Sequence, residues 1–167
     1  VTTFNVNGGD PTASDTLIVS ATGGNDTIGY NPSNTIGSGS VTVNAAPAVT
    51  FTTTEAVIID GQQGTDALTH TTPAGVHQVT YTPGPAPDSG TITTRGAGSG
   101  TALVPLTFSH LGANGSVTFA SGAGAREDVL ELYGTNDSDV FNVNAVADQI
   151  QILNPTGGFV TDALHTA

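Results

Sequence analysis

Short runs in which apolar and polar residues alternate are the feature that most constrains the fold of this chain. The clearest example is residues 15–30, where two such runs flank a glycine-rich turn and each opens on an aspartate. The apolar positions are Leu17 and Val19 after Asp15, then Ile28 and Tyr30 after Asp26. A period of two residues is typical of half-buried strands, because successive side chains in a strand point to opposite faces.

The composition supports strands throughout the chain. Thr, Val and Ile are abundant, and 22 Gly and 9 Pro interrupt every stretch that could form a helix. We therefore expect an all-β fold. A β-solenoid (parallel β-helix) is favoured, and the alternative is an antiparallel sandwich or trefoil-like arrangement, in which Val41/Val49 and Ile152/Phe159 would form hairpins.

The pattern of residues 15–60 occurs three times. Asp66 and Asp128 correspond to Asp15 as the openings of the second and third copies, and His77 and Asp139 correspond to Asp26. The sequence predicts a single all-β module over residues 1–167, with three quasi-repeats of about 56 residues. Their approximate bounds are 1–46 (completed by 157–167), 47–100 and 101–156.

The tail supplies the first half of a segment that residues 1–8 complete, so joining the two ends closes the pattern. We expect one period of a longer tandem array or filament, cut at an arbitrary point. A closed pseudo-threefold domain with adjacent termini would explain the match equally well. Because the chain starts on Val1 inside an expected strand, we also expect a mature or excised segment.

The charge balance limits the partners. The chain has fourteen acidic residues and only two basic ones, Arg95 and Arg126, so the net charge is −12. A phosphate backbone would find almost nothing to bind, so nucleic acid is excluded as a partner. Membrane insertion is not expected either, because no apolar run approaches the roughly 20 residues that a spanning helix needs.

No pattern of residues indicates a catalytic site, and we expect no enzymatic activity. Neighbouring carboxylates such as Glu127 and Asp128 would point to opposite faces of a strand, which is poor geometry for a two-carboxylate glycosidase. The histidines show no recurring spacing and are interpreted as strand or loop residues: His70, His77, His110 and His165. No cofactor is expected apart from the calcium alternative below.

Two turns resemble calcium-binding repeats. Residues 23–28, GGNDTI, resemble half of the nonapeptide of hemolysin-type (RTX) repeats, and residues 134–141 are a looser version. The resemblance makes Asp15, Asp26 and Asp139 calcium candidates, because carboxylates and turn carbonyls are ligands for this ion. The alternative is that these aspartates cap turns by accepting hydrogen bonds from nearby amides.

Three Asn-x-Ser/Thr sequons lie in expected turns, where a glycan would fit. They begin at Asn25, Asn114 and Asn136, and they are the candidate glycosylation sites. The alternative is that such sequons arise by chance in a chain rich in Asn, Ser and Thr.

More broadly, the chain resembles the tandem β-repeats of large bacterial extracellular and surface proteins. Residues 62–68 and 134–143 carry that resemblance, which implies an extracellular or cell-surface location and an adhesin-like structural role. We expect a subunit or repeat of a filament or giant surface protein, with copies of itself as partners. Assembly would use strand edges, such as Val1–Asn7 or Phe159–Thr166, or covalent tandem continuation.

Two other functions stay open. A carbohydrate-binding or adhesive module would need an exposed aromatic platform, for which Tyr133 is the best candidate. A calcium-stiffened spacer would use the turn aspartates as ligands.

Overall fold

In the computed structural model the described residues form strands, turns and loops, and none of them lies in a helix that could span a membrane. The structure describes the chain apart from residues 1, 10–13, 123–127, 137, 145–148, 155–157 and 166–167, and it describes no side chain from residue 143 onward. The strands are β1 (Thr3–Asn7), β2 (Thr16–Ser20), β3 (Thr27–Pro32), β4 (Gly39–Val43), β5 (Ala48–Thr52), β6 (Ala56–Asp60), β7 (Ala67–Thr71), β8 (His77–Pro83), β9 (Gly90–Gly96), β10 (Leu106–Ser109), β11 (Ser116–Ala120), β12 (Val129–Leu132), β13 (Val140–Asn144), β14 (Gln149–Asn154) and β15 (Gly158–His165). The all-β prediction is confirmed.

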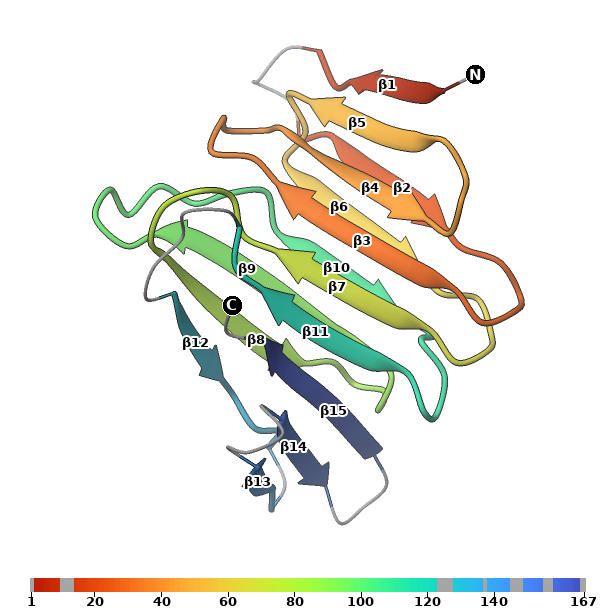
Figure 1. Ribbon diagram of the computed structural model, residues 1–167, viewed down its shortest axis with the longest axis vertical. Coiled ribbons are helices and arrows are strands. Elements are labelled where there is room, and N and C mark those ends of the chain that lie inside the picture. The colour runs from red at the N-terminus through yellow and green to blue at the C-terminus, as the bar shows by residue number, and fades with distance from the viewer. Residues whose placement is uncertain are drawn as a thin grey trace.

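The strands form two open, mixed sheets (Figure 1). The nine-stranded sheet has the order β1-β5-β4-β3-β7-β11-β15-β14-β13, and the six-stranded sheet has the order β12-β8-β9-β10-β6-β2. β1 and β13 are the outer strands of one sheet, and β2 and β12 are the outer strands of the other. Since neither sheet closes on itself, neither the trefoil-like arrangement nor the closed pseudo-threefold domain is observed.

The core lies between the two sheets and is built from the alternating apolar positions. Ile28 and Tyr30 of β3 are completely buried, as are Val57 and Ile59 of β6 in the other sheet, so the period-two prediction is confirmed for these strands. Across the core, the rings of Tyr81 on β8 and Phe119 on β11 lie edge to face. Burying such side chains is the main stabilising contribution to the sandwich.

Equivalent strands of the three sequence copies make equivalent pairs. We define unit I as β2–β6, unit II as β7–β11 and unit III as β12–β15. The second, third and fourth strands of each unit form an antiparallel meander: β3-β4-β5, β8-β9-β10 and β13-β14-β15. The Val41/Val49 pair of the hairpin alternative is observed directly, and β14 pairs with β15 with Ile152 opposite Val160.

Parallel pairs join the meanders to the other strands. The first strand of a unit pairs with the fifth strand of the same unit (β2 with β6, β7 with β11). It also pairs with the second strand of the preceding unit (β7 with β3, β12 with β8). The fifth strand pairs with the fourth strand of the next unit (β6 with β10, β11 with β15). β1 pairs with β5, the fourth strand of unit I, in the same way, so it takes the place of a fifth strand that precedes unit I.

Successive units exchange sheets. The meanders of units I and III lie in the nine-stranded sheet, whereas the meander of unit II lies in the six-stranded sheet. A simple parallel β-helix would have parallel pairs only. The sheets therefore combine the parallel pairing expected of a solenoid with the antiparallel hairpins of the alternative.

Glycine turns stack closely at one end of the strands, and Gly112 has the tightest position. It has a φ of 85°, and a β-carbon there would lie 1.9 Å from the backbone oxygen of Gly64. Because both the left-handed backbone and the contact penalise a side chain, we expect Gly112→Ala to lower the free energy of unfolding by at least about 2 kcal/mol. Urea denaturation followed by circular dichroism would measure this change.

Gly98 provides the matched control. A β-carbon at Gly98 would meet no atom within 4 Å. Gly98→Ala should therefore change the unfolding free energy by no more than about 0.5 kcal/mol. Equal effects of the two substitutions would contradict the stacked-turn explanation.

Candidate functional site

The aspartate that opens a unit binds the preceding unit. Asp66, just before β7, accepts a hydrogen bond from the backbone N–H of Asp26 at 2.9 Å. Asp128, just before β12, accepts one from the N–H of His77 at 2.8 Å. Asp26, just before β3, and His77, the first residue of β8, stand at equivalent positions of their units, so the same cap is made twice, once at each junction between units.

A second type of carboxylate cap closes the turn inside a unit. The carboxylate of Asp26 accepts hydrogen bonds from the amide and the hydroxyl of Thr22 and from the side-chain amide of Asn44. Asp139 makes the same pair of contacts with the amide and hydroxyl of Thr135. The four-residue spacing from threonine to aspartate therefore encodes a local cap.

The first junction places two carboxyl groups close together with opposite shifts in pKa. Burial raises the pKa of Asp66, and the nearby negative charge of Asp26 adds to that effect. Burial also acts to raise the pKa of Asp26, but the hydrogen bonds from Thr22 and Asn44 outweigh it, so this pKa lies below its usual value. Asp26 is therefore the group that keeps its negative charge as the pH falls.

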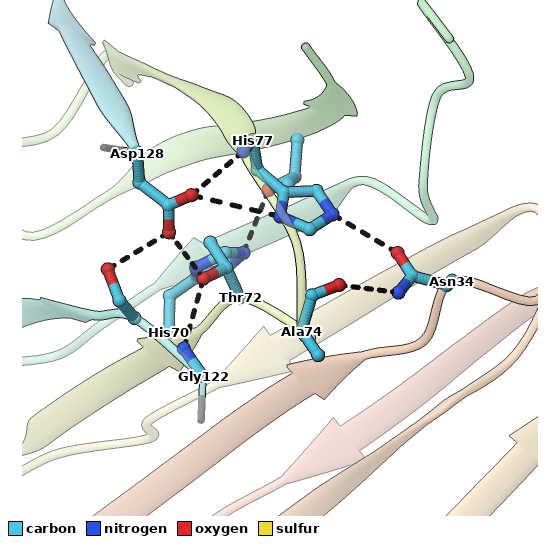
Figure 2. Close-up of polar contacts among 9 residues, drawn as sticks. Asn34, His70, Thr72, Ala74, His77, Gly122 and Asp128 are labelled. Carbon is cyan, nitrogen blue, oxygen red and sulfur yellow. Dashed lines mark hydrogen bonds and ion pairs between the residues drawn. The ribbon is translucent and has the colours of Figure 1, made fainter. Parts of the chain in front are cut away.

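The second junction is a larger polar cluster centred on Asp128 (Figure 2). One carboxylate oxygen accepts hydrogen bonds from the hydroxyls of Thr72 (2.6 Å) and Ser121 (3.0 Å). The other oxygen accepts the His77 amide and lies 3.8 Å from Nδ1 of the same residue. Nε2 of His77 lies 3.1 Å from Oδ1 of Asn34, so the cluster also reaches the β3–β4 loop of unit I.

This cluster contains a hydroxyl, an imidazole and a carboxylate, but its arrangement suits cohesion between units. Thr72 and His77 are only 3% and 2% exposed, so a substrate would not reach them. A nucleophilic hydroxyl would donate its hydrogen bond to the imidazole that acts as its base. The Thr72 hydroxyl instead donates to the carboxylate of Asp128. The hydrogen bonds join segments from all three units into one network.

The two ends of the sandwich expose apolar residues whose equivalents inside the chain are buried. Phe4 on β1 is 51% exposed, whereas its equivalent Val57 is completely buried. Phe141 on β13 is 45% exposed, whereas its equivalent Ile28 is completely buried. The core is therefore complete in the middle of the molecule and open at both ends.

Asp15 marks the open end of unit I. It stands where Asp66 and Asp128 stand in the other units, but no donor among the described residues reaches its carboxylate. Oδ2 is buried without a partner in both Asp15 and Asp66, so the difference lies at Oδ1, which in Asp66 accepts the amide of Asp26. The site is otherwise formed: Gly8 lies beside this carboxylate as Gly61 lies beside that of Asp66. This end thus has the acceptor of a junction cap without its donor.

The structure places the calcium candidates apart from one another. Asp26 and Asp139 occupy the turn caps of different units, and Asp15 lies at the open end. Within the described part of the chain, no group of three or more His, Cys, Asp or Glu side chains could hold a metal ion. Calcium binding stays a prediction, to which the observed contacts add no ligand set.

The other sequence candidates lie on the surface or outside the described residues. Asn25, Asn114 and Asn136 are exposed, and Oδ1 of Asn25 accepts a hydrogen bond from the amide of Thr65. Tyr133, the candidate for a sugar platform, is 54% exposed. Arg126, Glu127 and the side chain of His165 are outside the part of the chain that the structure describes.

Comparison with known proteins found no match: no family model, curated protein or solved structure resembles the chain closely enough to assign it.

Sequence reasoning did not identify the caps between units. Their signal was present, because Asp15, Asp66 and Asp128 each directly precede the first strand of a unit. The donor could not be inferred, since it belongs to the preceding unit and is reached only through the parallel pairing of β7 with β3 and of β12 with β8.

Proposed function

We propose that the chain is a structural subunit or repeat of an extracellular bacterial filament or giant surface protein, with copies of itself as partners. Assembly proceeds through strand edges at the two ends of the sandwich or through covalent tandem continuation. The observation that carries this proposal is the open core at both ends, where Phe4 and Phe141 stay half exposed at positions that are fully buried between units.

Three of the four outer strands also lack the usual protection against pairing, and only β12 carries a charged residue, Glu131. Natural monomers protect edge strands with charges, prolines or bulges. β1 (TFNVN), β2 (TLIVS) and β13 (VFNVN) contain no charged residue and no proline, and Ile18 of β2 is 63% exposed. Such edges favour addition of strands from another copy.

One expected edge is not available. β15, which contains most of the segment Phe159–Thr166, lies between β11 and β14 and is paired on both sides. Strand addition at the second end therefore falls to β12 and β13. β1 keeps its place as an edge at the first end.

The finer architecture within this proposal is a solenoid of units. The units repeat their pairing pattern along the sandwich, so further units can be added at either end without changing it. The acidic surface, with a net charge of −12, keeps the sides of such a filament apart while the ends associate.

Electron microscopy of the purified protein tests the proposal. We expect unbranched fibres whose width is that of one sandwich, with assembly that depends on protein concentration. A protein that stays a monodisperse monomer in sedimentation experiments up to about millimolar concentration would overturn it, because edge pairing of this extent should be detectable there.

A further inference from the structure

The exchange of sheets between units determines how a second copy docks. Resting on the proposed function, we infer that β1 and β2 of one copy pair in parallel with β12 and β13 of the preceding copy, so that the nine-stranded sheet of each copy continues the six-stranded sheet of its neighbour. Neighbouring copies are then related by a half-turn about the filament axis combined with a translation.

The pairing pattern inside the chain shows which strand each free edge accepts. The outer side of β12, a first strand, is where a fifth strand binds in units I and II, as β6 binds β2 and β11 binds β7. β1 is a fifth strand by its pairing with β5. β2 is also a first strand, and its outer side is free. In units II and III that side of the first strand binds the second strand of the preceding unit, as β7 binds β3 and β12 binds β8. β13 is a second strand with a free outer side, so it fits the outer side of β2.

Each unit lies in the opposite sheets from the unit before it. Because one chain contains three units, an odd number, the next copy also begins in the opposite sheets. β12 belongs to the six-stranded sheet, and its new partner β1 belongs to the nine-stranded sheet of the next copy. β13 belongs to the nine-stranded sheet, and its partner β2 belongs to the six-stranded sheet. Two copies together contribute fifteen strands to each continuous sheet, so a strand spacing of about 4.8 Å gives a helical rise of about 36 Å per copy.

The register follows from the internal pairs. Leu17 pairs with Val57 and Leu68 with Val117, so Leu130 meets Phe4 of the next copy. Ile28 pairs with Leu68, so Phe141 meets Leu17 of the next copy. Both pairs join partly buried or exposed apolar residues on the core side, and docking completes the layer that is open at each end.

The backbone and Asp15 are poised for the same contacts. The amide of Gly8 donates to Thr52 on β5, so by alternation the amide of Asn5 points to the free side of β1. The amide of Ala21 donates to Asp60 on β6, so the amide of Ile18 points to the free side of β2. Asp15, which lacks a donor, receives the amide of Asp139 from the preceding copy, as Asp66 receives that of Asp26.

Cysteine pairing tests the docking, because the natural chain contains no cysteine. Glu131 and Asn5 face outward and are opposite each other in the inferred register. We expect a mixture of Glu131→Cys and Asn5→Cys chains to form a disulfide-linked dimer under mild oxidation, and each variant alone to form none. Thr107→Cys, exposed in the middle of the six-stranded sheet, replaces Glu131→Cys as the control and should give at least tenfold less dimer.

Blocking the edge provides the second measurement. Asn5→Pro removes the outward amide of β1, while Asn5→Thr removes the same side-chain contact with Thr50 but keeps the amide. We expect Asn5→Pro to raise the critical concentration for assembly about tenfold or more and Asn5→Thr to leave it nearly unchanged. Circular dichroism melting would verify that both variants fold.

The outcomes separate this inference from the proposed function. Fibres that form without the Glu131–Asn5 link, or a single-cysteine variant that links to itself, overturn the docking but leave a filament. A wild-type chain that never associates overturns both. A mixed dimer, together with the effect of Asn5→Pro and a rise near 36 Å per copy, supports the docking.

Discussion

Asp128→Ala should destabilise the folded chain by about 3 kcal/mol, seen as a lower urea midpoint with little change in the denaturant slope. The substitution removes the only carboxylate of the polar cluster in Figure 2 and leaves three donors behind: the His77 amide and the hydroxyls of Thr72 and Ser121. The amide cannot turn toward water, because His77 is buried. The junction between units II and III thereby loses its principal polar contact.

The conservative change and the repeat itself supply two controls. Asp128→Asn keeps an oxygen acceptor for the His77 amide, so we expect it to cost about half as much as the alanine variant. Asp15→Ala alters the equivalent residue at the open end, where the carboxylate has no donor among the described residues. Below the assembly concentration it should change stability by no more than about 0.5 kcal/mol.

A large effect of Asp15→Ala in the monomer would contradict the junction-cap explanation, because it would show that this carboxylate acts within its own unit. In the proposed filament the same variant has a second expected effect. If Asp15 receives the amide of Asp139 from the preceding copy, it should weaken assembly without weakening the fold, which sedimentation would measure.

The local structure was predictable from the sequence because burial on one face of a strand requires period two. Val57 and Ile59 or Leu68 and His70 alternate with more exposed neighbours as the sequence indicates. The repeat was also visible, since the opening aspartates and the apolar positions recur at matching offsets. Both signals are local, and the strands that they predict are the ones observed.

The arrangement of strands into sheets was not predictable in the same way. Alternation is identical for a strand with parallel or antiparallel neighbours, so the sequence alone left the solenoid and the sandwich open. Successive units exchange sheets because the connections from β6 to β7 and from β11 to β12 carry the chain from one sheet to the other. Nothing in the composition of a loop such as residues 61–66 specifies that crossing.

The histidines illustrate the limit for single residues. The histidines were interpreted as strand or loop residues, and His70 and His77 lie in β7 and β8, but their surroundings come from residues distant in the sequence. Nε2 of His70 lies 3.0 Å from the hydroxyl of Thr94, and its ring packs between those of Tyr30 and Phe119. A residue at this position in the other units is Val19 or Leu132, so the sequence suggests an apolar site that a histidine occupies.

Burial at that site makes stability depend on pH. It lowers the pKa of His70 from 6.5 to about 4, because the charged imidazolium would lie in the core. The folded state therefore keeps His70 neutral while the unfolded chain takes up a proton below pH 6.5. The stabilising contribution is complete above pH 6.5 and is lost as the pH falls toward 4, by about 3 kcal/mol in all.

His70→Leu should remove this loss. We expect the difference in unfolding free energy between pH 7 and pH 4 to shrink by about 2–3 kcal/mol relative to the wild type, as measured by urea denaturation at both pH values. His110→Gln is the control, because the exposed His110 pairs with Asp60 and its pKa is raised by that hydrogen bond. Since a raised pKa stabilises the folded state at low pH, this variant should not reduce the acid-induced loss. An unchanged pH dependence in His70→Leu would show that the loss comes from the carboxyl groups, whose pKa values at Asp26 and Asp60 are lowered in the fold.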